Sequence, residues 1–203
     1  MAPPIDEMMS RLGVAPALTG TNADRVAAFE RDVEAPLPAV YRTFLNRYGG
    51  VRPAGQIEYP IREPCPWGQR GIVSRFFGLS DDPDMDIRRA TLETYAGRIP
   101  DETIPIAEDP GGNLVVLGVE GMVKDRVFFW DHEHREAGGR LNEMAAELTE
   151  TGEDLRRYDA HRLIRRWEER FPERRSKPLG YGNVYTVAES FAAFLSSLVV
   201  ATD

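Results

Sequence analysis

The pattern of apolar and polar positions near the start of the chain predicts a first helix. Val26, Phe29 and Val33 recur at three- and four-residue spacing, which places them on one face of a helix. Thr21 or Asn22 can cap this helix, because a short polar side chain accepts a hydrogen bond from an N–H group of the first turn. The spacing therefore predicts an amphipathic helix with one buried face.

A second apolar stripe predicts a helix that ends at a glycine pair. Its members share one helical face and are Tyr41, Phe44, Leu45 and Tyr48. Pro38 suits the first position of this helix, where its missing N–H would have no partner. We expect Gly49 to end the helix in a left-handed conformation, so that Gly49→Val should lower the melting temperature. Gly50 then lets the chain reverse toward a strand.

Short runs of β-branched and aromatic residues predict strands in the middle of the chain. We expect them over Gln56–Tyr59, Ile72–Leu79, Thr103–Ala107, Asn113–Val119 and Arg126–Asp131. The Asp109–Gly112 turn predicts a hairpin between the third and fourth of these. The run Val127–Trp130 is apolar on both faces, which is typical of a central strand. A helix from Asp86 to Gly97 separates the second strand from the third.

The last part of the chain predicts an inserted helix and a closing helix. Thr186 and Glu189 have the spacing of a capping box, and the apolar face of the closing helix consists of Phe191, Phe194, Leu195 and Leu198. Before it lies a charged segment with a helix that begins near Thr151. The apolar positions of that helix are Ala160, Leu163, Ile164, Trp167 and Phe171.

Together these elements predict an α+β fold, a mostly antiparallel sheet of about five or six strands packed with N-terminal and C-terminal helices. The length of 203 residues fits one large domain. We expect residues 1–20 to be an N-terminal extension and residues 21–203 to form a single domain. A helical insertion occupies about residues 138–182 of that domain.

Charge narrows the class of partner. The net charge is -8 and the pI is near 5.1, which argues against nucleic-acid binding, because that needs a basic face. The segment 135–182 holds 11 basic and 10 acidic residues, and the rest of the chain holds 14 basic and 23 acidic residues. The acidity therefore belongs to the expected core domain, and a basic partner is favoured over an acidic one.

The sequence also predicts a cytoplasmic protein. No apolar run approaches the roughly 18 residues that a membrane-spanning helix needs, and the opening Met1–Glu7 lacks the order of a signal peptide. Cys65 is the single cysteine, so it can form no internal disulfide, which agrees with a reducing compartment. We expect no membrane contact and no cofactor.

Two groups of residues could carry chemistry. His132 and His134 flank Glu133 directly after a predicted strand, and residues two apart on a strand share a face, so two imidazoles could meet one metal ion. A third ligand is lacking, which favours a surface position at the end of the strand. Cys65 stands in a Pro-Cys-Pro-Trp setting that matches no thiol-enzyme signature. We therefore assign no catalytic or metal-binding residue.

Acidic loops are the leading candidates for binding a partner. The candidate positions are Asp81, Asp82, Asp84, Asp86, Glu108 and Asp109, together with the further loop acids Asp101, Glu102 and Glu120. If the loops converge, one negative field would steer a basic partner; otherwise these are separate solvated charges. Trp167, beside Arg165 and Arg166, has the composition of a binding hot spot, although packing within its own domain is the simpler role.

Three blocks of this sequence resemble the SUKH superfamily. The first runs from Leu37 to Gly50, and the second combines Ile104–Asn113 with the strand that ends in Trp130 and Asp131. The third lies in the closing helix. The positions that carry the resemblance are Leu37, Pro38, Tyr41, Phe44, Leu45, Gly49, Gly50, Gly112, Trp130, Phe191 and Phe194. Most of them are helix stops, turns and core positions by the pattern above, so they identify a fold.

The resemblance implies helices packed on a mostly antiparallel sheet and a function in binding. Bacterial members of the superfamily are typically immunity proteins that block a cognate toxin, such as a nuclease. A toxin that binds nucleic acid is itself basic, which suits an acidic inhibitor. A regulatory scaffold similar to the fungal regulators of cell-wall synthesis is the alternative, and a metal-dependent hydrolase that uses His132 and His134 is a third possibility.

Overall fold

The computed structural model describes residues 4–17, 23–133, 139–155, 158, 160–172 and 182–201. Its α-helices are α1 (Ile5–Arg11), α2 (Ala23–Asp32), α3 (Ala39–Tyr48), α4 (Ile87–Arg89), α5 (Gly139–Glu150), α6 (Ala160–Arg170) and α7 (Phe191–Ser197). A π-helical turn, η1 (Ala90–Thr94), continues α4, and a 3-10 turn, η2 (Gly121–Val123), links two strands. None of the described helices is long and apolar enough to cross a membrane.

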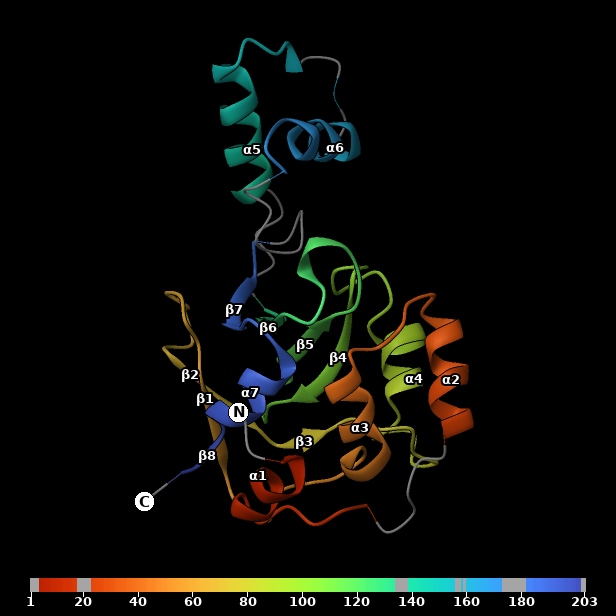
Figure 1. Ribbon diagram of the computed structural model, residues 1–203. Coiled ribbons are helices and arrows are strands. Elements are labelled where there is room, and N and C mark those ends of the chain that lie inside the picture. Colours follow the sequence, from red (N-terminus) through yellow and green to blue (C-terminus); the bar gives the residue numbers. More distant parts are fainter. Residues whose placement is uncertain are drawn as a thin grey trace.

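The strands form two antiparallel sheets (Figure 1). They are β1 (Ile57–Pro60), β2 (Arg70–Val73), β3 (Arg75–Phe76), β4 (Thr103–Glu108), β5 (Leu114–Gly118), β6 (Val127–Trp130), β7 (Val184–Ala188) and β8 (Val199–Val200). The larger sheet has the order β3-β4-β5-β6-β7 and the smaller one has the order β2-β1-β8. The predicted α+β fold is confirmed, and β6 lies between two partners, as expected of a central strand.

The predicted strand over Ile72–Leu79 is divided between the two sheets. Its first part belongs to β2 and its second part is β3, with Ser74 between them. Both the backbone N–H and the hydroxyl of Ser74 donate to the carbonyl oxygen of Glu108, at 2.8 Å each. This contact turns the chain from one sheet to the other, which a continuous apolar run does not reveal.

Aromatic side chains of α3 and α7 form the centre of the core. Tyr41 and Phe44 of α3 contact Phe191 of α7, with ring centroids 4.8 and 5.2 Å apart in edge-on geometry, an arrangement that aromatic pairs favour. Other members of this core that the resemblance singled out are Leu37, Leu45, Trp130 and Phe194, all buried. Burial of these side chains supplies much of the free energy of folding.

The expected role of Gly49 is wrong in its mechanism. Gly49 is extended, with φ −64° and ψ 139°, and Gly50 takes the left-handed conformation, with φ +76°. A side chain at Gly49 would instead place its Cβ 2.8 Å from the Leu45 carbonyl oxygen, so steric crowding disfavours Gly49→Val. Pro38 precedes the first helical residue by one position.

The predicted capping box at Thr186 is also wrong. Thr186 lies in β7, where it pairs with Phe128 of β6, and α7 begins five residues later. Its cap is Ser190, whose hydroxyl accepts from the N–H of Ala193 at 3.1 Å. The β-branched residues around Thr186 favour a strand, and this preference outweighs the capping spacing. The other predicted cap, Thr21 or Asn22, lies outside the described residues.

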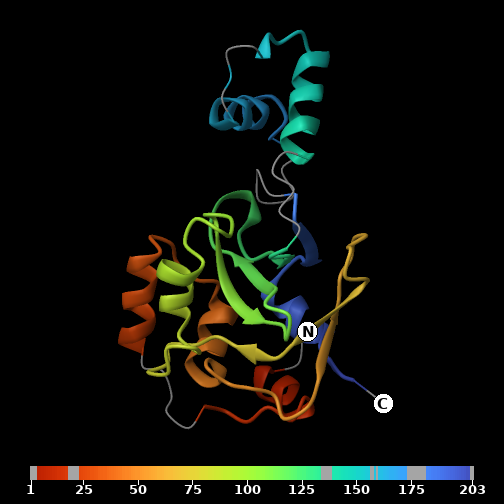
Figure 2. The same ribbon diagram turned by 180° about the vertical axis from the view of Figure 1, so that it is seen from behind.

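The segment that the sequence predicts to be an insertion contains a pair of helices, α5 and α6, whereas the sequence predicted one. Met144 and Leu148 of α5 and Trp167 of α6 form a hydrophobic cluster separate from the main core, with Leu155, Leu163 and Phe171 against it. Figures 1 and 2 show the pair standing apart, at the end of the molecule opposite α1 and β8. The side chain of Ile164 and the flanks 134–138 and 173–181 lie outside the described residues.

Candidate partner-binding surface

The acidic loop between β3 and α4 is an ordered turn. The hydroxyl of Ser80 accepts from the N–H of Asp82 at 3.1 Å, and the Asp82 carboxylate accepts from the N–H of Asp84 at 3.0 Å. Met85 is buried and its N–H donates to the Asp82 carbonyl oxygen. Asp81, Asp82 and Asp84 are exposed, and the side chain of Asp81 is 97% accessible. The turn therefore presents three carboxylates to solvent from a fixed backbone.

Neighbouring elements anchor this loop at both ends. Asp86 caps α4, because its carboxylate accepts from the N–H groups of Arg88 and Arg89 at 3.3 and 3.2 Å. Gly78 donates to the Met85 carbonyl oxygen and accepts from the N–H of Ile87. Asp86 thus caps α4, and Asp81, Asp82 and Asp84 are the exposed carboxylates of the loop. The partner-binding role expected for Asp86 stays a prediction.

Glu108 and Asp109 are less exposed than the carboxylates of the acidic loop, and both are held in contacts within the protein. Glu108 forms an ion pair with Arg75, and both side chains are largely buried. The guanidinium of Arg75 also lies 5.4 Å from the ring centre of Phe77. Asp109 accepts from the N–H groups of Gly111 and Asn113 at 2.8 and 2.9 Å, which fixes the β4–β5 turn. Their partner-binding role, expected from the sequence, stays a prediction.

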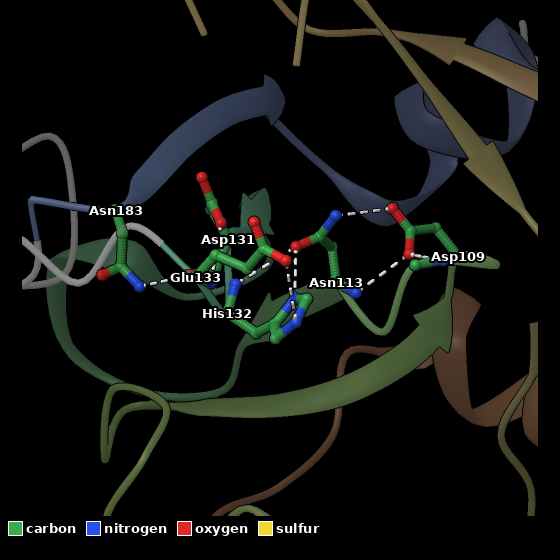
Figure 3. A network of polar contacts seen from close by, with 7 residues as sticks. Asp109, Asn113, Asp131, His132, Glu133 and Asn183 are labelled. Atoms are coloured by element: carbon green, nitrogen blue, oxygen red, sulfur yellow. Dashed lines mark hydrogen bonds and ion pairs between the residues drawn. The ribbon is translucent and has the colours of Figure 1, made fainter. Parts of the chain in front are cut away.

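A network of polar contacts joins the β4–β5 turn to the end of β6 (Figure 3). The side-chain amide of Asn113 donates to Asp109 at 2.8 Å, while its oxygen accepts from the backbone N–H of His132 at 3.1 Å and lies 2.9 Å from the His132 ring. Asn113, Asp131 and Asn183 are buried. At the ends of β6 and β7, the backbone N–H of Asp131 donates to the carbonyl oxygen of Asn183, and the side-chain amide of Asn183 donates to the carbonyl oxygen of Asp131. The network therefore fixes the register of the strand ends.

The residues considered for chemistry are held in structural contacts. His132 contacts Asn113 and Glu133, and His134 lies outside the described residues. No group of three His, Cys, Asp or Glu side chains able to hold a metal ion occurs within the described part of the chain. Cys65 is half-buried, and this burial raises the pKa of its thiol. A raised pKa leaves less thiolate, the nucleophilic form, at neutral pH.

Trp167 lies inside the helical pair. Its side chain is 4% exposed and its indole N–H donates to the Glu147 carboxylate of α5 at 2.6 Å. Phe171 packs on it, with ring centroids 5.9 Å apart. These contacts describe packing between α5 and α6, and a partner could reach Trp167 only if the pair opened. The partner-binding role of Trp167 remains a prediction.

Sequence reasoning missed a pocket beside η1. The pocket has a volume of about 240 Å³ and lies between the end of α2, the turn η1 and the chain leading into β4. Leu92, which lies in the segment predicted to be a helix from Asp86 to Gly97, is 41% exposed at the edge of the pocket. The one indication of this pocket in the sequence was that the helical segment between Asp86 and Gly97 has few apolar residues. The π-helical turn itself has no sequence signature.

The chain is similar to proteins of one described family. Residues 20–152 match the model of the SMI1 / KNR4 family (SUKH-1). The SPbeta prophage-derived uncharacterized protein YokK of Bacillus subtilis (strain 168) is 30% identical over 123 residues, which cover 54% of this chain and 62% of that protein. The match therefore spans less than two thirds of the relative's length. No solved structure matches this chain.

Proposed function

Because this chain belongs to the SMI1 / KNR4 (SUKH-1) family, which includes immunity proteins, we propose that it is a non-enzymatic protein that neutralises a cognate bacterial toxin by binding it directly. The complex forms in the cytoplasm and needs no cofactor. The toxin is a basic protein, such as a nuclease, and the bound partner is the protein itself, neither nucleic acid nor a membrane.

The ordered acidic loop is the observation that carries this proposal. Asp81, Asp82 and Asp84 are exposed on a turn that internal hydrogen bonds and the Asp86 cap hold in place. A rigid charged loop loses little conformational entropy on binding, since its backbone is already ordered. Fixed negative charge also raises the rate at which a basic partner associates.

The distribution of charge over the chain agrees with this assignment. Outside residues 135–182 the chain carries 23 acidic and 14 basic residues. A nuclease surface that binds phosphates is rich in lysine and arginine, so it would be attracted to this part of the molecule. Charge complementarity also discriminates against acidic proteins, because juxtaposed like charges are unfavourable.

Co-expression with the toxin encoded beside this gene tests the proposal. We expect the two proteins to co-purify at equal stoichiometry and the host to survive a toxin that otherwise stops growth. Toxin released from the complex by denaturant should have an unchanged mass and should regain its activity on refolding.

The state of the released toxin shows whether this protein only binds the toxin or modifies it chemically. A toxin that returns cleaved or covalently modified would show that this protein is an enzyme. Survival of the host without any complex would also contradict the proposal. The matched control is a toxin from another gene neighbourhood, which should neither co-purify nor be neutralised.

A further inference from the structure

The pocket beside η1 is lined by apolar and polar atoms in similar measure, and its apolar side chains come from several elements. Val33 follows α2, Leu92 and Tyr95 come from η1 and its end, and Ile99 and Ile104 come from the chain that enters β4. Its volume of about 240 Å³ is below the roughly 300–1,000 Å³ of small-molecule sites. The size therefore suits one side chain of a protein better than a metabolite or cofactor.

The π-helical turn η1 contributes Thr91 and Leu92 to the lining of this pocket. The N–H of Tyr95 donates to the carbonyl oxygen of Ala90 at 2.9 Å, five residues earlier. This wider turn occurs mostly as a single turn and frequently at functional sites. Gly97, with φ +67°, ends the segment, and the chain then passes along the pocket to Asp101. Leu92 is left partly exposed at the edge.

One acidic residue, Asp101, lies in the lining of the pocket. Asp101 is exposed, and within the described residues its carboxylate has no ion-pair partner. Three other exposed acids directly follow lining residues in the chain, namely Glu34, Glu93 and Glu120. Of these, Glu93 forms an ion pair with Arg89. Arg98 is the basic residue of this segment, and its guanidinium lies over the rings of Tyr95 and Trp130.

We propose that this pocket takes an arginine side chain of the protein partner. The aliphatic stem of the arginine packs against Val33, Leu92 and Ile99, and its guanidinium pairs with the carboxylate of Asp101. Arginine combines these two needs, because its stem buries along apolar surface while its planar head forms paired hydrogen bonds with a carboxylate. That the partner is a toxin rests on the proposed function; the pocket chemistry does not.

Binding of a minimal probe tests this pocket without any toxin. The probe is N-acetyl-arginine amide, titrated into the full-length protein while backbone amide signals are followed by NMR. We expect shifts confined to residues 91–104, Val33 and Val119. N-acetyl-citrulline amide, which has the same shape without the charge, should bind more weakly by roughly two- to fivefold, as for a solvent-exposed ion pair.

Two variants decide whether Asp101 is the anchor. Asp101→Asn should remove the preference for arginine over citrulline and leave the melting temperature unchanged, because its carboxylate makes no ion pair in the described chain. Asp84→Asn, in the acidic loop, is the matched control and should leave the preference intact. Ala96→Trp, at a lining position, should abolish the shifts for both probes.

Several results would overturn the inference. These are an absence of shifts at the pocket, shifts centred on residues 80–86, equal binding of arginine and citrulline amides to the unmodified chain, and tighter binding of N-acetyl-norleucine amide, which would indicate an apolar pocket only. Failure to co-purify with a toxin while the arginine probe binds would refute the proposed function and leave this inference standing.

Discussion

Gly78 lies against the peptide that joins Gly49 to Gly50. A Cβ added at Gly78 would come within 2.1 Å of the Gly49 carbonyl carbon and of the Gly50 nitrogen. Neither contact can be relieved by rotating a side chain, because both atoms belong to the backbone. The end of α3 and the start of the acidic loop therefore touch through three glycines.

Gly78→Ala should destabilise the fold, since the helix end and the loop must separate to admit the methyl group. We expect the free energy of unfolding to fall by roughly 1–3 kcal/mol, the usual cost of overpacking, in urea titrations followed by circular dichroism. Gly55→Ala is the control, because a Cβ at Gly55 meets nothing within 4 Å. Equal stability of the two variants would show that this contact is absent.

Asp109 and Asp81 should behave oppositely in stability and in binding. Asp109→Ala leaves the N–H groups of Gly111 and Asn113 without their acceptor, which should lower the free energy of unfolding by roughly 1–3 kcal/mol. Asp81→Ala removes a single surface ion pair with Arg25 and should cost less than about 1 kcal/mol. Toxin association should slow only for Asp81→Ala. The reverse ranking would exclude the loop as the binding surface.

The sequence alone could not separate these two aspartates. Both stand in turn-forming stretches with proline nearby, and each turn can direct a carboxylate to solvent or to its own backbone. Asp109 turns inward because Gly111 and Asn113 bring two N–H groups to it. Burial of Tyr41, Phe44 and Leu45 was predictable, because helical spacing fixes which side chains share a face.

At the scale of elements, the helical pair has a hydrophobic cluster of its own. Trp167, Met144 and Leu148 contact one another and are separate from the main core. An ion pair between Arg166 and Glu153 adds to the contacts near α6. The helical pair therefore packs around its own hydrophobic cluster, which is separate from the hydrophobic core of the rest of the chain.

Removing the pair should leave the core folded. Replacing Arg140–Leu179 by a short Gly-Ser linker removes the separate cluster, and loop length itself changes the entropy of closure only slightly. We expect a cooperative thermal transition for the shortened protein, followed by near-ultraviolet circular dichroism, which reports the buried aromatic residues. A protein that is insoluble or lacks that signal would show that α5 or α6 covers essential apolar surface.

The existence of most elements was predictable, and their ends and partners were less so. Met144 and Leu148 lie four positions apart, a spacing that could have indicated α5. The division at Ser74 depends on a contact with Glu108, which is distant in sequence, so local patterns cannot show it. The capping spacing of Thr186 and Glu189 was misleading for a similar reason, because pairing with β6 decides that segment.

At the scale of the whole molecule, the segment that contains the helical pair and the rest of the chain, which contains the acidic loop, differ in net charge. The segment 135–182 is nearly neutral, with 11 basic and 10 acidic residues, and the acidic excess lies in the rest of the chain. A basic partner is therefore attracted first to the core. Such attraction acts over about 8 Å at physiological ionic strength, so its effect on the association rate should depend on salt.

The association rate of a charge-reversed variant tests the central claim most directly. Asp81, Asp82 and Asp84 are changed together to Lys, and the rate of binding to the toxin is measured by stopped flow at low and at physiological salt, with circular dichroism as the folding control. Changing the exposed Glu7, Glu143 and Glu150 to Lys makes the same change in net charge elsewhere. We expect the loop variant to associate several-fold more slowly than the control variant at low salt, with the difference shrinking as salt rises. Equal rates for the two variants at low salt would contradict the assignment of the acidic loop as the surface that receives the toxin.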